Sequence, residues 1–62
     1  MAWLAVDESG VCTIFEDKPH RVENPVAGNY WDSNSKYCIV EDDVIDIILG
    51  HKLTWNDEPV EI

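Results

Sequence analysis

Apolar residues recur at helical spacing in the segment 41–55. Val44 and Ile48 form one i,i+4 pair and Ile45 and Leu49 form another, so these four side chains stack on one face of a helix. A helix of about two turns is marginal on its own in water, so it must pack on other elements. The pattern predicts one short helix with Ile48 in the core, held by strands.

The residues at both ends of this helix agree with the prediction. Asp42 and Asp43 are of the type that caps a helix start, and their charges suit its positive end. Gly50 can adopt the left-handed conformation that ends a helix, and Lys52 then places positive charge near the negative end. Asp46 is left for the solvent side.

An apolar pattern on either side of a turn predicts a hairpin formed by residues 3–6 and 11–15. Asp7 at the first turn position and Gly10 at the fourth suit a type I turn that ends in a left-handed glycine. If Asp7 opposes Val11, both faces of the hairpin are apolar. The pairs are then Leu4 with Ile14 and Val6 with Cys12 on one face, and Trp3 with Phe15 and Ala5 with Thr13 on the other. One face can hold the helix, and the other needs loops, another part of the chain or a partner to cover it.

Proline, glycine and asparagine punctuate residues 16–34 and supply turn chemistry instead of a regular pattern. A long structureless loop is unusual in a compact domain. We therefore expect Tyr30 and Trp31 to be anchored, for instance in a short strand, over the face that carries Trp3 and Phe15.

The remaining apolar segments alternate as strands at 36–40, 53–55 and 60–62, with a turn over 56–59 between the last two. The element order is β-β-(β)-β-α-β. This order predicts an α+β fold, a small and mostly antiparallel sheet with one short helix packed on it. At 62 residues, we expect residues 1–62 to form a single small domain.

The chain is strongly acidic, with 13 Asp and Glu against 4 Lys and Arg and a formal net charge of −9. Nucleic-acid backbones and anionic membranes repel such a surface, so we expect no direct binding to either. The same charge would attract a basic protein partner. It would equally serve only to keep a small protein soluble and monomeric.

The N-terminal apolar run lacks a basic flank and is interrupted by Asp7, unlike a secretory signal. No run approaches the ~18 apolar residues of a membrane span. Two cysteines without a signal sequence indicate reduced thiols in a cytosol. We therefore expect a cytoplasmic protein.

Four short segments of the chain are distinctive: 3–7 with Gly10, 15–19, 31–32 and 52–60, which include Trp3-Leu4-Ala5-Val6-Asp7 and Leu53-Thr54-Trp55. Together they resemble a group of small proteins of tailed phages and prophages that have no known activity. The resemblance implies a protein that acts inside a bacterial host cell. It implies no functional residue, because the group brings no known chemistry.

The residues that could carry chemistry are isolated from one another. Cys12, Cys38, His20 and His51 lack the close Cys-x₂₋₄-Cys spacing of structural zinc sites, so we expect no metal and no cofactor. The cysteines are expected to be free, and to serve as small strand residues of the core. Neither cysteine has a signature of a thiol nucleophile around it.

Adjacent carboxylates, such as Asp7 and Glu8, fall at turn and helix-start positions and follow no EF-hand spacing. Catalytic pairs need unequal environments, one apolar and one wet. We therefore expect a protein that is not an enzyme.

Acidic and aromatic residues are the remaining candidates for function. Trp is a common interface anchor. The leading hypothesis is a non-enzymatic intracellular protein–protein interaction module, a phage or prophage accessory protein acting on a host or phage protein. Its candidate partner-binding residues are Trp55, Asp42, Asp43, Asp46, Asp57 and Glu58. One alternative is a self-associating homodimer in which the second sheet face is buried. Another is an acidic mimic of nucleic acid that inhibits a DNA- or RNA-binding host protein.

Overall fold

The computed structural model describes residues 2–62, which form six strands and one helix. This arrangement confirms the predicted α+β fold. The elements are, in chain order, β1 (Trp3–Val6), β2 (Cys12–Phe15), β3 (His20–Asn24), β4 (Gly28–Asp32), β5 (Tyr37–Val40), α1 (Asp42–Leu49) and β6 (Val60–Glu61).

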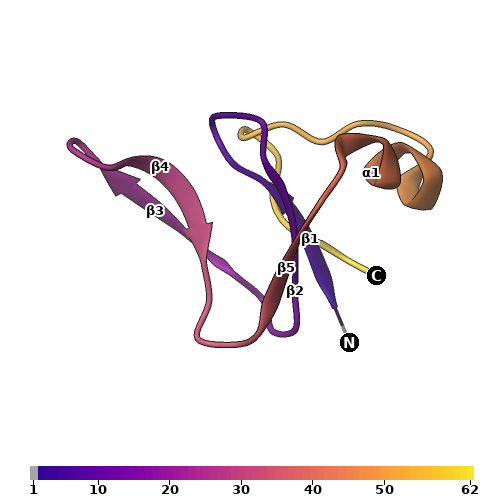
Figure 1. Ribbon diagram of the computed structural model, residues 1–62, viewed down its shortest axis with the longest axis horizontal. Coiled ribbons are helices and arrows are strands. Elements are labelled where there is room, and N and C mark those ends of the chain that lie inside the picture. Colours follow the sequence, from indigo (N-terminus) through magenta and orange to yellow (C-terminus); the bar gives the residue numbers. More distant parts are fainter. Residues whose placement is uncertain (1) are drawn as a thin grey trace.

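The strands form two antiparallel sheets. Four strands make the main sheet in the order β5-β2-β1-β6, and β3 pairs with β4 as a separate hairpin. Figure 1 shows the β3–β4 hairpin on one side of the main sheet and α1 on the other. The main sheet is therefore the middle layer, and it supports a different element on each face.

The first hairpin has the predicted register. Leu4 pairs with Ile14 and Val6 with Cys12, while Trp3 pairs with Phe15 and Ala5 with Thr13. Asp7 closes the turn, since its carbonyl accepts the Gly10 N–H at 3.0 Å and its N–H donates to the Val11 carbonyl at 3.1 Å. The Asp7 carboxylate also accepts the N–H groups of Ser9 and Val11, each at 3.0 Å. Gly10 has φ 91°, a left-handed conformation that costs glycine little.

One core lies between the main sheet and α1. Its buried residues are Leu4, Val6, Cys12 and Ile45, with Ile14, Val40, Leu49 and Leu53 packed around them. Ile45 is the only helix residue here that is fully enclosed, with 1% of its surface exposed. The helix ends at Gly50, which has φ 77° and donates its N–H to the Asp46 carbonyl at 2.8 Å, as predicted.

The prediction that Ile48 lies in the core is wrong. Ile48 is 45% exposed and Ile47 is 79% exposed. The helix is only eight residues long, and it meets the sheet through the line of Ile45 and Leu49. Ile48 is turned about 60° around the helix axis from Ile45, which moves it off that narrow contact line.

The helix start also differs in detail from the prediction. Glu41 is the N-cap residue, with extended backbone and no side-chain hydrogen bond to the helix. Asp42 and Asp43 lie inside the first turn, where their charges still suit the positive helix end. Asp46 is partly exposed and pairs with Lys52, with Oδ2 and Nζ 3.0 Å apart.

A second core lies between the main sheet and the β3–β4 hairpin. Ala5, Phe15 and Trp31 are buried in it, and Trp3 and Trp55 pack against them. The Trp31 Nε1–H donates to the Val6 carbonyl at 2.9 Å. Trp31 therefore covers the Trp3 and Phe15 face, as predicted, although the sequence did not reveal β3 or the full length of β4.

The predicted strand over 53–55 is wrong. Thr54 instead starts a turn, since its N–H donates to Asp57 Oδ2 at 2.8 Å and its carbonyl accepts the Asp57 N–H at 3.0 Å. Leu53 packs in the helix core and Trp55 in the hairpin core. The alternation of apolar residues thus reflects a segment that passes between two cores. Within residues 2–62, no helix is long and apolar enough to cross a membrane.

Burial predicts a sharp contrast between two isoleucines of α1. Ile45→Ala is expected to lower the free energy of unfolding by about 2–4 kcal/mol, because it removes a fully buried side chain. Ile47→Ala is expected to change it by less than about 0.5 kcal/mol, because Ile47 lies at the surface. Urea unfolding followed by tryptophan fluorescence measures both, and equal losses would contradict the observed helix face.

Candidate functional site

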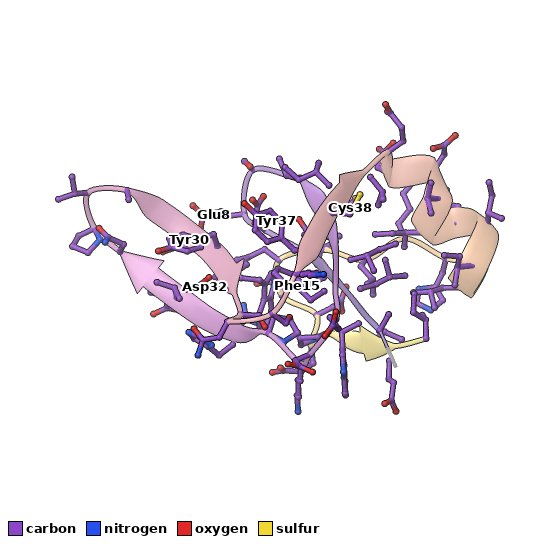
Figure 2. The ribbon with its side chains drawn as sticks, turned by 60° about the horizontal axis from the view of Figure 1, so that its bottom comes forward. Glu8, Phe15, Tyr30, Asp32, Tyr37 and Cys38 are labelled. Carbon is purple, nitrogen blue, oxygen red and sulfur yellow. The ribbon has the colours of Figure 1, made fainter. Side chains whose placement is uncertain are left out.

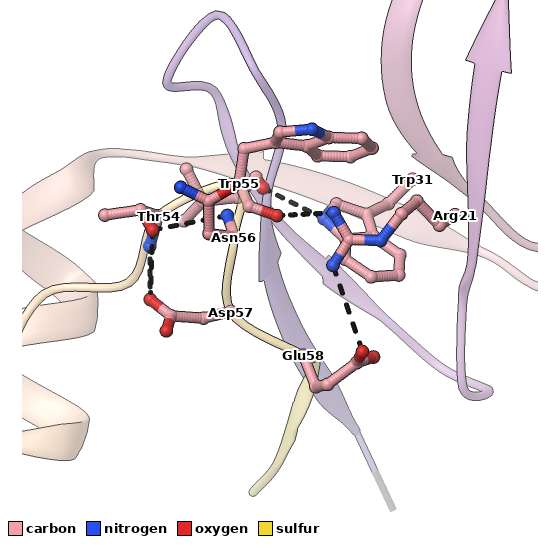
Figure 3. Close-up of polar contacts among 8 residues, drawn as sticks. Arg21, Trp31, Thr54, Trp55, Asn56, Asp57 and Glu58 are labelled. Carbon is pink, nitrogen blue, oxygen red and sulfur yellow. Dashed lines mark hydrogen bonds and ion pairs between the residues drawn. The ribbon is translucent and has the colours of Figure 1, made fainter.

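An arginine joins the hairpin to the C-terminal segment (Figure 3). The Arg21 guanidinium carbon lies 4.4 Å from the centre of the Trp31 ring and 4.3 Å from that of the Trp55 ring. Its Nη1 donates to the Trp55 carbonyl at 2.6 Å, and its Nη2 lies 4.0 Å from a Glu58 carboxylate oxygen. A planar guanidinium suits this site because it can stack on rings and donate hydrogen bonds at the same time.

These contacts give several of the predicted partner-binding residues a role within the chain. The Trp55 ring packs against Trp31, with ring centres 5.4 Å apart. Asp57 closes the Thr54 turn, and Glu58 faces Arg21. The structure brings these three predicted residues together on one short segment.

The other three predicted residues lie on α1. Asp42 and Asp43 are exposed at its first turn, and Asp46 is held by Lys52. The six candidates thus form two groups on different elements. Their contact with a partner stays a prediction.

Strand β5 has the most exposed apolar side chains of the main sheet. It lies at the edge of the sheet, and Tyr37 and Ile39 are each 65% exposed. Both side chains lie on the hairpin side, because they pair with Phe15 and Thr13 of β2. Tyr37 packs its ring against Phe15, with ring centres 6.0 Å apart, and leaves the rest of its surface open.

A groove of about 260 Å³ lies between β5 and the hairpin. Tyr37 and Ile39 form one wall, Tyr30 and Trp31 of β4 form the opposite wall, and Phe15 lies between them. Figure 2 shows Tyr30 and Tyr37 on the two sides, with Phe15 and Asp32 at the lower end. The remaining lining residues are Asp7, Val11, Thr13 and Asp32.

The groove is apolar in its walls and acidic in its charge. Asp7 and Asp32 are its charged lining residues, and no basic residue lines it. Beyond one end, the Asn29 Nδ2–H donates to Glu8 Oε2 at 2.8 Å, which links the hairpin to the first turn. Such a surface favours an apolar side chain that lies next to a positively charged one.

No group of three or more His, Cys, Asp or Glu side chains within residues 2–62 is arranged to hold a metal ion. Comparisons of the chain with protein-family models, with curated proteins and with solved structures find no match. The resemblance to phage proteins therefore stays a prediction that rests on the sequence segments.

Sequence reasoning did not place Tyr37 or Ile39 among the candidate partner-binding residues. The apolar pattern of their segment predicts a strand, but it does not distinguish an edge strand from a central one. Only the strand order shows that β5 has one neighbour, β2, and so leaves these side chains open.

The two cysteines occupy different environments. Both are free, Cys12 buried and Cys38 exposed, so the prediction of two free thiols is confirmed and that of Cys38 in the core is wrong. Cys38 is exposed because it lies on the edge strand, away from the helix contact. Burial raises the pKa of the Cys12 thiol, and the nearby carboxylates of Asp42 and Asp7 raise it further.

Removing the stacked cation is expected to destabilise the protein. Arg21→Ala should lower the free energy of unfolding by about 2 kcal/mol, because it removes two ring contacts and a charged hydrogen bond. Arg21→Lys should lose about half as much, since an ammonium cannot stack as a plane. Glu58→Gln is the matched control, with an expected change under about 0.5 kcal/mol for its exposed, long contact. Urea unfolding measures all three, and full stability of Arg21→Lys would contradict a role for stacking.

The thiols are expected to react at different rates. Iodoacetamide at about pH 8 should modify Cys38 of the folded protein and spare Cys12, because only an exposed thiolate attacks. Unfolded protein should be modified at both positions, as mass spectrometry can show.

The raised pKa of Cys12 also fixes the sign of a pH effect. The folded state disfavours the Cys12 thiolate. Cys12 therefore contributes fully to the free energy of unfolding below the pKa of the unfolded chain, about 8.5, and this contribution is lost as pH rises through the higher pKa of the folded state. The free energy of unfolding should therefore fall less with rising pH in Cys12→Ala than in the unchanged protein. An equal fall in both would contradict the raised pKa of Cys12.

Proposed function

We propose that this chain is a non-enzymatic protein–protein interaction module that binds a protein partner in the groove between β5 and the β3–β4 hairpin. The observation that carries the proposal is the exposure of Tyr37 and Ile39 at 65% each along an open, apolar groove. Large apolar side chains exposed side by side are typical of interaction sites. Each of them lies opposite a second wall that the hairpin supplies.

The occupant that fits this groove is a protein segment with an apolar side chain next to a Lys or Arg. The volume of about 260 Å³ is below the roughly 300–1,000 Å³ of small-molecule pockets, and the groove opens to the surface. It has room for one or two side chains. The rim acids Asp7 and Asp32 would meet the positive charge.

The acidic surface has a separate role in the proposal. A net charge of −9 would steer a basic partner toward the protein, and the groove would then hold it. Asp42 and Asp43 are the predicted residues most available for steering, because both are exposed at the start of α1. Trp55 would act through Arg21, by fixing the hairpin wall.

The setting of the proposal is the bacterial cytoplasm, with the chain as a phage or prophage accessory protein acting on a host or phage protein. The resemblance of its sequence segments supports this setting. Nucleic-acid mimicry has less support, because several acids are engaged within the chain. Asp57 accepts turn hydrogen bonds, Asp46 pairs with Lys52, and Glu58 lies 4.0 Å from Arg21.

Capture from a bacterial lysate tests the groove. The immobilised protein should retain a specific partner that mass spectrometry identifies and that salt releases, because exposed charges are screened over about 8 Å at physiological ionic strength. Tyr30→Ser should remove most of the captured partner, since the loss of an anchor ring can exceed about 2 kcal/mol, or about 30-fold. Asp32→Lys should do the same, because it places a positive charge where the Lys or Arg of the partner would lie.

Val26→Ser is the matched control. Val26 is 96% exposed at the tip of the same hairpin and does not line the groove, so this variant should capture the partner normally. Far-UV circular dichroism establishes that each variant is folded. Equal capture by all variants, or no specific capture by the unchanged protein, would reject the groove as the binding site.

A further inference from the structure

The backbone of β5 has unused hydrogen-bonding groups along its outer side. The Glu16 N–H donates to the Lys36 carbonyl at 3.0 Å, which makes these two residues a hydrogen-bonded pair of the β2–β5 ladder. Successive residues of a strand point their N–H and C=O groups to opposite sides. Lys36, Cys38 and Val40 therefore bond toward β2, while Tyr37 and Ile39 direct their backbone groups away from the sheet.

The two edges of the main sheet differ in their protection. Strand β6 has only two residues and follows Pro59, and both features discourage pairing with another chain. Strand β5 has four residues, Tyr37–Val40, with no proline and no charge among them. Two hollows also adjoin β5, an apolar one near Lys36 and Tyr37 and a mixed one near Ile39 and Glu41. The open edge is thus the one best suited to pairing.

Charge along β5 is arranged so that the strand complements itself. Lys36 precedes the strand, and Glu41 and Asp42 follow it. Glu41 keeps an extended backbone, with φ −67° and ψ 147°, so the strand direction continues through Glu41 to Asp42, the first residue of α1. When two copies pair antiparallel, the basic end of each lies beside the acidic end of the other.

We propose that β5 pairs antiparallel with β5 of a second copy of this chain, across a two-fold axis at Ile39. Residues directly opposite in a sheet share a face, so a symmetric pair can be centred on one residue and its copy. Centring on Ile39 places the two Ile39 side chains together and sets Cys38 against Val40. It also sets Lys36 against Asp42 of the second copy, twice by symmetry.

The charges select this register over its neighbour. Centring the pair on Cys38 would instead set Lys36 against Val40 and leave Asp42 without a basic residue opposite. In the proposed register, the outward N–H and C=O of Ile39 bond those of Ile39 in the second copy, and the Tyr37 carbonyl faces the Glu41 N–H. The Glu41 carbonyl already accepts the Val44 N–H at 3.1 Å within its own chain. The repulsion between two chains of charge −9 is screened beyond about 8 Å at physiological ionic strength, so the paired ends dominate at contact.

The dimer does not rest on the proposed partner binding. It needs only the edge of β5, whereas the groove uses the side chains of β4 and β5 on one face. The pairing brings the grooves of the two copies next to each other across the axis. A partner would then meet a double surface with two hairpins at its outer sides.

Sedimentation equilibrium of the full chain tests the pairing. At about 100 µM the unchanged protein should have twice its 7.1 kDa mass, and the mass should fall on dilution. Ile39→Lys should give a monomer, because it sets two like charges opposite each other on an exposed edge. Ile47→Lys, at an isoleucine of α1 that is 79% exposed, should leave the dimer intact.

A charge exchange tests the register. Lys36→Asp and Asp42→Lys should each raise the dimer Kd at least about tenfold, since each acts twice across the axis, and the double variant should restore it. A monomeric unchanged protein, or a dimer that survives Ile39→Lys, would overturn the proposal. Loss of the dimer in Ile39→Lys without rescue by the double variant would overturn the register at Ile39. Lysate capture by Tyr30→Ser is a separate readout, so the groove and the dimer can fail independently.

Discussion

Burial of β1 on both faces is the constraint on which the rest of the structure depends. Leu4 and Val6 point toward α1, and Ala5 between them points toward the β3–β4 hairpin. All three are at least 94% buried, as their exposed fractions are 0%, 6% and 2%. A chain of 62 residues has too little apolar material for one large core, so it builds two thin ones on a shared strand. Every other element is placed by the core that it closes.

Local patterns sufficed to predict the elements whose partners lie nearby in the chain. The turn at Asp7 and Gly10 set the register of β1 and β2, because a turn type fixes which residues oppose each other. The helix and its end at Gly50 followed from spacing and one glycine. The burial of Ile48 was predicted wrongly because the sequence pattern does not show how wide a strip of the helix contacts the sheet.

The candidate site depends on long-range order and so was less accessible from the sequence. The pairing of β3 with β4 was hidden by Pro25 and Gly28, which here belong to the tight turn at the hairpin tip, where Asn24 Oδ1 accepts the Val26 and Ala27 N–H groups. Contact of Arg21 with the Trp31 and Trp55 rings, and its hydrogen bond to the Trp55 carbonyl, join positions 34 residues apart. The acids chosen from composition could not be sorted into engaged and available ones without these contacts.

The small size of Ala5 has a consequence for the width of the groove between β5 and the β3–β4 hairpin. Ala5 lies between the main sheet and the hairpin, in the core with Phe15 and Trp31. The side-chain volume at this position acts as a spacer, because close-packed interiors transmit added volume to their neighbours. A serine would keep the two layers at their present separation, whereas a valine or leucine would push the hairpin outward and widen the groove. The width of the groove would thus change among descendants of this chain through one residue that does not line it.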